Sequence, residues 1–145
     1  MGDVVKILGI GLSRTGTKSL LAALRVLGFS TVHYPETLDE IEARDAAADI
    51  TVVMMRDELV ERYPDAKWIL TVRDKADWLA SMERHYKRRP VHKHRPIIGK
   101  VRQAVYGTKG FDSEKMNRVY ERNLREAVER FGDNLLMLDI CGGEG

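Results

Sequence analysis

The chain has 145 residues, a length that suits one domain. Hydrophobic residues make up 43% and charged residues 32%, and a formal net charge of +2 gives no reason to expect nucleic acid as a partner. The sequence shows neither the roughly 18 apolar residues of a membrane span nor the apolar run of a signal peptide. With one cysteine it cannot form an internal disulfide. We expect a single cytoplasmic domain, residues 1–145, with no membrane partner.

The first third of the chain predicts a strand, a loop, a helix and a second strand. Residues 4–10 are a short, β-branched apolar run typical of a buried strand, and residues 11–15 predict a loop. After Gly16, leucines recur at helical spacing until Gly28, which is a typical helix stop. Residues 29–34 are β-prone and lead into a proline.

The middle of the chain predicts two helices, a strand and a further helix. Thr37 can cap a helix that runs to about residue 48, and a second helix has its apolar face over residues 52–60. Residues 67–72 form the clearest central strand, and residues 76–86 predict the helix after it.

The last third begins with a basic loop at residues 87–94. Helices are predicted at residues 96–106 and, capped by Asp112 or Ser113, up to Phe131; an apolar strand follows at residues 134–140. Strands that alternate with helices predict an α/β fold, with a mostly parallel sheet covered by helices on both faces.

The junction between the first strand and the first helix has the composition of an anion-binding loop. Gly11 and Gly16 let the backbone curl close to a ligand, and the helix that follows offers unpaired amides and a positive dipole end. Arg14 and Lys18 add positive charge. The hydroxyl donors are Ser13, Thr15, Thr17 and Ser19. This density of donors at a strand-to-helix junction predicts a site for phosphate or sulfate.

This loop departs from the two best-known nucleotide motifs. Gly11 and Gly16 have the spacing of an ATP-type P-loop, but Thr17 occupies the lysine position and Lys18 comes one residue late. The dinucleotide fingerprint also fails, because its third glycine is absent.

A second motif lies at the central strand. Arg73 comes at the carboxyl end of that strand, where α/β sheets place ligand residues, and Ser81 follows eight positions later on the next helix. An arginine and a hydroxyl in one crevice suit a second phosphate.

Together the two motifs resemble the PAPS-dependent sulfotransferase family, in particular its short bacterial-type members; PAPS is 3′-phosphoadenosine 5′-phosphosulfate. The family's K/R-[ST]-G-T-[TK] core is similar to residues 14–18. Its R-[ND]-P-x-[DE]-x-x-x-S motif is similar to residues 73–81, where Lys75 replaces the proline. The resemblance implies a three-layer P-loop-like fold. It also leads us to expect a domain shortened at its C-terminus, because relatives continue with helical sequence that closes the site.

The resemblance also implies a reaction. A sulfuryl group passes from PAPS, leaving the bisphosphate PAP, to a hydroxyl or amine of a small-molecule or glycan-like acceptor, and no metal is required. Arg14 would hold the bridging oxygen, and Arg73 and Ser81 would bind the 3′-phosphate. The 5′-phosphate would be bound by the loop around Arg14, namely Ser13, Thr15, Gly16, Thr17, Lys18 and Ser19.

An acceptor hydroxyl needs a general base, and three residues are candidates. Glu36 follows the second strand, where several branches of the resembled family place a glutamate. His33 lies close by and is of a residue type well suited to proton transfer near neutral pH. Asp49 precedes the second helix of the middle region.

Two other functions remain open from the sequence. A P-loop nucleotide kinase or NTPase would use Lys18 and Ser19 in a shifted register, with Asp74 or Asp139 on magnesium. A non-catalytic module would bind PAP or PAPS without transferring the sulfuryl group.

Overall fold

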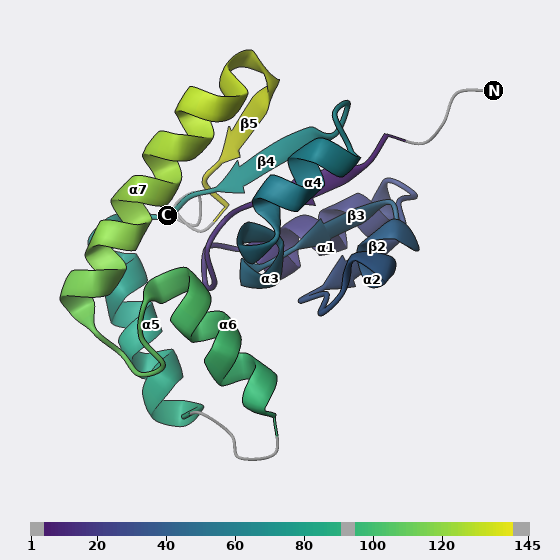
Figure 1. Ribbon diagram of the computed structural model, residues 1–145. Helices are drawn as coiled ribbons and strands as arrows, with labels where there is room; N and C mark the ends of the chain where they lie inside the picture. Colours follow the sequence, from purple (N-terminus) through teal and green to yellow (C-terminus); the bar gives the residue numbers. More distant parts are fainter. Residues whose placement is uncertain (1–4, 91–94, 141–145) are drawn as a thin grey trace.

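The protein is described by a computed structural model that covers residues 5–90 and 95–140. Its centre is a five-stranded, all-parallel sheet with the strand order β2-β3-β1-β4-β5 (Figure 1). The strands are β1 (Ile7–Gly9), β2 (Thr31–His33), β3 (Ala46–Ala48), β4 (Lys67–Thr71) and β5 (Leu135–Leu138). The helices are α1 (Thr17–Val26), α2 (Leu38–Glu42), α3 (Ile50–Met54), α4 (Arg56–Arg62), α5 (Lys75–Arg88), α6 (Pro96–Tyr106) and α7 (Ser113–Phe131), with a short 3₁₀ turn at Gly132–Asn134.

Helices cover both faces of the sheet, as the sequence predicts. Neighbouring residues of a strand point to opposite faces, so Ile7 packs against the leucines of α1 while Leu8 packs on the other side. That other side is covered by α3, α4 and α7, which contribute Val52, Leu59 and Ala127. The result is a three-layer α/β architecture of the P-loop-like kind.

A third apolar cluster lies beyond the carboxyl ends of the strands. There α5 and α6 pack with the first half of α7 to form a wall next to the strand-to-helix loops (Figure 1). Its largest fully buried side chains include Trp78 of α5, Tyr106 of α6 and Met116 of α7. This wall faces the edge of the sheet where the predicted ligand residues lie.

The region predicted as one helix from Thr37 to residue 48 is different. The helix α2 ends at Glu42, and Ala46–Ala48 forms β3, a fully buried strand between β1 and β2. Alanine has little β-propensity, so the helical prediction followed local preference and tertiary packing overrode it. The two strands β1 and β3 approach closely: a Cβ added to Gly9 would lie 2.9 Å from the Cβ of Ala48. Small residues are therefore needed at this contact.

Other helix boundaries are confirmed or adjusted. Thr37 caps α2 in a capping box with Glu40, and Asp112 caps α7. The single helix predicted to carry its apolar face over residues 52–60 and to end near Tyr63 is two helices, α3 and α4, which meet at Met55, and the second of them ends at Arg62. The helix α5 continues to Arg88, so the start of the predicted basic loop is helical, and residues 91–94 of that loop lie outside the described residues.

None of the described helices has the length and apolar character needed to cross a membrane. Within residues 5–90 and 95–140, no group of three or more His, Cys, Asp or Glu side chains is placed to hold a metal ion.

Candidate functional site

Backbone strain marks the carboxyl edge of the sheet. Among the described residues, the non-glycine positions with positive φ are Arg14 (65°), Tyr34 (55°) and Asp49 (104°). They follow β1, β2 and β3 respectively, so three strained positions lie at one edge of the sheet. Such conformations cost free energy and gather at functional sites, which makes this edge the candidate site.

The loop after β1 approaches β4 too closely for any side chain at Gly11. A Cβ there would lie 1.9 Å from Thr71 Oγ1 and 2.9 Å from the Thr71 backbone oxygen. Thr15 fills the neighbouring space, and its hydroxyl donates to the Leu12 carbonyl at 2.6 Å and lies 2.7 Å from the Thr71 hydroxyl. The buried side chain of Thr15 therefore fixes the curl of the loop on β4.

Ser13 is held from the helical wall. The indole N–H of Trp78 donates to the Ser13 carbonyl at 2.7 Å, and the Ser13 amide donates to the Tyr106 hydroxyl at 3.3 Å. Burial is the largest cause that raises the pKa of Tyr106 in this position, so its phenol stays protonated. Side chains from α5 and α6 thus set the position of a loop that is far from them in the sequence.

The start of α1 is open to an anion. Its N-cap is Gly16, at φ 97°, and no side chain caps the first amides. Thr17 is buried, while the side chains of Lys18 and Ser19 are exposed on the first turn of the helix. The helix N-terminus therefore offers amides and a positive dipole end, with one exposed lysine on the same turn.

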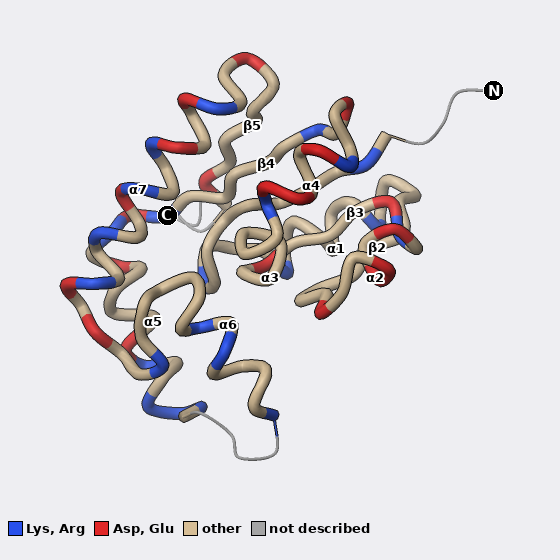
Figure 2. Tube along the Cα trace, in the orientation of Figure 1, with Lys and Arg blue, Asp and Glu red and all other residues tan. Residues whose placement is uncertain are grey.

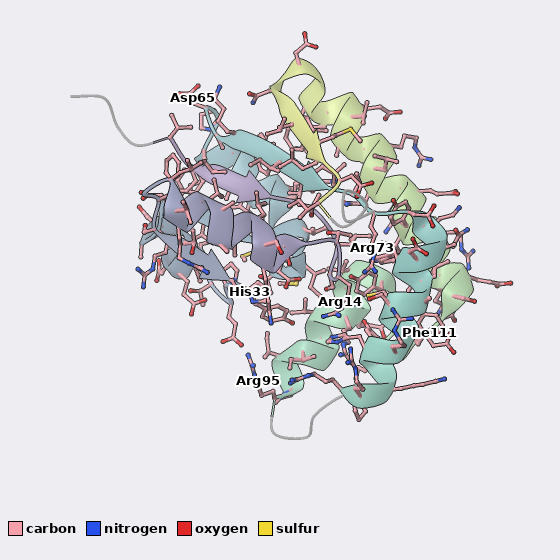
Figure 3. All side chains as sticks on the ribbon, turned by 180° about the vertical axis from the view of Figure 1, so that it is seen from behind. Arg14, His33, Asp65, Arg73, Arg95 and Phe111 are labelled. Carbon is pink, nitrogen blue, oxygen red and sulfur yellow. The ribbon has the colours of Figure 1, made fainter. Side chains whose placement is uncertain are left out.

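The structure brings Arg14, Arg73 and Ser81 together. Arg14 Nε donates to Ser81 Oγ at 3.4 Å, and Arg73 Nη1 donates to the Arg14 carbonyl at 3.1 Å. The carbonyl of Arg73 in turn accepts a hydrogen bond from the Tyr120 hydroxyl. Figure 3 shows Arg14 and Arg73 near one another, beside α5. The two sequence motifs thus meet at Arg14, whose guanidinium contacts the Ser81 hydroxyl and whose backbone carbonyl contacts the guanidinium of Arg73.

A second group of side chains lies at the ends of β2 and β3. His33 Nε2 is 2.6 Å from Asp49 Oδ2, and Ser13 Oγ donates to Asp49 Oδ1 at 3.2 Å. Asp49 is only 7% exposed, and its Oδ1 also accepts from the amide of Ile50, so the carboxylate is fixed from several directions. Two of the predicted base candidates are therefore partners of each other, and they adjoin the anion-binding loop.

The third base candidate is engaged elsewhere. Glu36 Oε1 accepts a hydrogen bond from Arg95 Nη2 at 3.0 Å, and both side chains are largely exposed. The structure does not bring Glu36 to the group formed by His33, Asp49 and Ser13.

Positive charge gathers on α5 and α6 near this edge (Figure 2). Burial lowers the pKa of His85, and the nearby guanidinium groups of Arg14 and Arg102 lower it further. Burial also raises the pKa of Tyr34, with the Asp49 carboxylate adding to the effect. This cationic surrounding therefore disfavours the protonated form of His85.

Sequence reasoning missed several residues of this edge. The hydroxyls of Thr71 and Tyr106 position the loop, and Thr71 is the residue that a side chain on the predicted loop glycine Gly11 would meet. Two further residues lie at this edge: Tyr34 in the loop after β2, and Arg102 on α6. Strained φ angles and long-range hydrogen bonds identify these residues, and neither signal is present in a short stretch of sequence.

Comparison with known proteins adds two findings. A family model described as a sulfotransferase domain matches residues 6–44 and 38–140. Among curated proteins, the chain is similar to "Ava biosynthesis cluster protein M" of Aspergillus versicolor, at 32% identity over 54% of this chain and 42% of that protein. The match thus spans less than half the length of that relative.

Proposed function

This chain belongs to the sulfotransferase domain family, and we propose that it transfers a sulfuryl group from PAPS to a hydroxyl or amine of a small-molecule or glycan-like acceptor. The observation that carries the proposal is the meeting of Arg14, Arg73 and Ser81 at the carboxyl edge of the sheet. PAPS carries a 3′-phosphate that ATP lacks, and a second cationic position beside the predicted anion loop suits that phosphate.

The residues around the loop suit the donor. The uncapped amides of α1 and the absence of a side chain at Gly16 leave room for a 5′-phosphate against the backbone. In this proposal the 5′-phosphate is bound by Ser13, Thr15, Gly16, Thr17, Lys18 and Ser19. Arg73 and Ser81 bind the 3′-phosphate. When bound, PAPS supplies an activated sulfur–oxygen bond to the phosphate.

Arg14 stabilises the charge of the reaction. As the sulfur–oxygen bond to the phosphate breaks, negative charge builds on the phosphate oxygen, and a guanidinium group at that point lowers the barrier. Its positive φ and the hydrogen bond from Arg73 to its carbonyl hold the backbone of Arg14 in place. An arrangement fixed in advance avoids reorganisation during the reaction.

His33 is the general base in this proposal. The acceptor oxygen forms a bond to sulfur while its proton passes to the imidazole. Because Nε2 is bound to Asp49, Nδ1 is the ring atom that takes the proton. Asp49 acts as a positioning residue, since its carboxylate orients the ring and stabilises the imidazolium that forms.

The first test measures the melting temperature with PAP, with ATP and with AMP, each with and without magnesium. We expect PAP alone to raise it, because a ligand at 100 times its dissociation constant adds about 2.7 kcal/mol of stability. Arg73→Ala should lose the response to PAP. The matched control is Arg118→Ala, at an exposed arginine of α7, which should keep it.

Turnover is then measured by mass spectrometry, with PAPS and a panel of hydroxyl and amine acceptors. Sulfated product that disappears in Arg14→Ala supports the transferase. A response only to ATP with magnesium would point to a kinase or NTPase instead. Tight PAP binding with no product on any acceptor would favour a binding module.

A further inference from the structure

Three polar atoms close to the carboxyl edge are buried without a hydrogen-bond partner. They are the hydroxyls of Tyr34 and Tyr86 and Nη1 of Arg102. Buried polar groups are nearly always paired, so each such atom requires an explanation. These three come from the loop after β2, from α5 and from α6, yet they lie in one cluster.

Arg102 is the centre of the cluster. Only 5% of the residue is exposed, and its guanidinium carbon lies 3.9 Å from the centre of the Tyr86 ring. Nη2 donates to the carbonyl of Arg89 at 3.0 Å, which leaves Nη1 as the unpaired donor. A buried cation is stable only when its donors are satisfied, so this site is built for an acceptor atom.

Most of the charge around Arg102 and Tyr86 is positive, while the Asp49 and Glu36 carboxylates act on Tyr34. His85 of α5 is affected by Arg14 and Arg102, together with Arg88 and Arg89 at the end of α5, and all four lower its pKa. Burial raises the pKa of Tyr86 to about 12, although the adjacent guanidinium of Arg102 interacts with the phenol and acts in the opposite direction, so the phenol stays protonated. Cationic and phenolic donors that converge in a partly dehydrated place select an anion.

The cluster adjoins the reacting centre. Tyr34 follows His33 directly, and Tyr106, one turn after Arg102 on α6, accepts a hydrogen bond from the Ser13 amide. Ser81, which accepts from Arg14, lies one turn before His85 on the same face of α5. The unpaired donors therefore lie near both His33 and Arg14, with Ser81 of the predicted 3′-phosphate site one turn away on α5.

We propose that Arg102, Tyr86 and Tyr34 bind a carboxylate on the acceptor, so that the acceptor is a hydroxylated or aminated organic acid. This proposal rests on the function proposed above, because it assigns the cluster to the acceptor of that reaction. A carboxylate offers several lone-pair sites, enough for the guanidinium Nη1 and both phenols. It also offsets the buried positive charge of Arg102.

The test uses a matched pair of probes on the protein saturated with PAP. They are 4-hydroxyphenylacetate and its neutral amide, 4-hydroxyphenylacetamide, which have the same shape and the same hydroxyl. Calorimetric titration should give a dissociation constant at least about tenfold lower for the carboxylate, because a charge-assisted hydrogen bond is the difference between them. Equal constants, or no binding of the carboxylate at millimolar concentration, would overturn the proposal.

Variants assign the preference to the cluster. Arg102→Met should abolish the difference between the two probes. Tyr86→Phe keeps the ring that packs on Arg102 and removes only the hydroxyl, so it should weaken carboxylate binding several-fold even if Arg102→Met does not fold. Arg118→Ala, in an exposed part of α7, should leave both constants unchanged. A preference that survives both cluster variants would contradict the assignment.

Titrations with and without PAP distinguish a failure of this proposal from a failure of the proposed sulfuryl transfer. Failure of PAP to bind would refute the donor site, while a carboxylate preference without PAP would still show the anion site. Carboxylate binding that PAP displaces would instead assign the cluster to the donor, and would overturn the proposal.

Discussion

The two halves of the carboxyl edge are built in opposite ways. The half at β1 and β4 is closed by bonds within the protein: the Thr15 hydroxyl meets Leu12 and Thr71, and Trp78 donates to Ser13. The half at β2 faces α5 and α6 with buried polar atoms that lack partners. Hydrogen bonds within the protein hold the first half in place, whereas the second half contains donors without a partner in the protein.

We interpret this difference as one of roles: the first half supports the phosphate loop, and the second half recognises the acceptor. A loop that must present backbone amides to a phosphate needs a rigid backbone, and internal hydrogen bonds provide it. A place that must recognise a variable group needs donors that remain available. We therefore expect changes in the first half to act on stability and donor binding, and changes in the second half to act on turnover and acceptor choice.

The largest expected effect is at Gly11. Gly11→Ala forces the loop away from β4, because the new Cβ meets a backbone oxygen and not only the end of a flexible side chain. We expect a loss of about 3 kcal/mol or more in the free energy of unfolding, measured by urea denaturation. Gly110→Ala is the matched control, because nothing lies within 4 Å of its Cβ, and it should change stability little. Equal effects at both glycines would break the comparison.

A smaller effect on stability and a large one on catalysis is expected at His33. The side chain lies at the surface end of β2, so His33→Ala should leave the melting temperature and its rise with PAP almost unchanged. The rate constant kcat should fall by about 10²–10⁴, the range for a lost general base. Asp49→Asn should lower kcat less, because the His33 imidazole remains but is held more weakly. If Glu36→Gln abolished turnover and His33→Ala did not, the base assignment would be wrong.

The smallest expected effect is a pH dependence of stability at His85. Burial, then Arg14 and Arg102, lower the pKa of His85 in the folded protein, so the unfolded chain binds this proton more readily. The stability contributed by neutral His85 is complete above its ordinary pKa of about 6.5 and is lost as the pH falls toward the lowered value. Melting temperatures followed from pH 8 to pH 5 should decline less in His85→Gln, and a parallel decline in both proteins would contradict this reasoning.

Much of the half at β1 and β4 could be predicted from sequence, because its residues lie close together along the chain. The residues from Gly11 to Ser19 form one loop and one helix start, and Arg73 and Ser81 belong to one strand–helix unit. Such units fold in a standard way, so residue type and spacing indicate where their side chains go. The structure brings Arg14, Arg73 and Ser81 together, and their roles in binding PAPS stay a prediction.

The missed strand shows why the other half could not be predicted. Ala46–Ala48 has no local tendency to form a strand, and it does so because it fits between β1 and β2 under the tightly packed α1. With β3 assigned to a helix, Asp49 appeared as a residue before a helix. In the structure it is the N-cap of α3, as that prediction placed it, and it also follows the end of β3, where Ser13 of the loop after β1 donates to it.

The sequence by itself determined the α/β class and indicated where the predicted anion loop and the second motif lie, because each depends on hydrophobic period or on residues within a few positions of one another. Tertiary structure alone decided which base candidate has a partner. The parallel register pairs His33 with Ala48, and this places Asp49, the next residue, against the imidazole. It also gathered Tyr34, Tyr86 and Arg102 from three elements. Contacts between distant segments depend on strand order and helix packing, and no local pattern of residues encodes either.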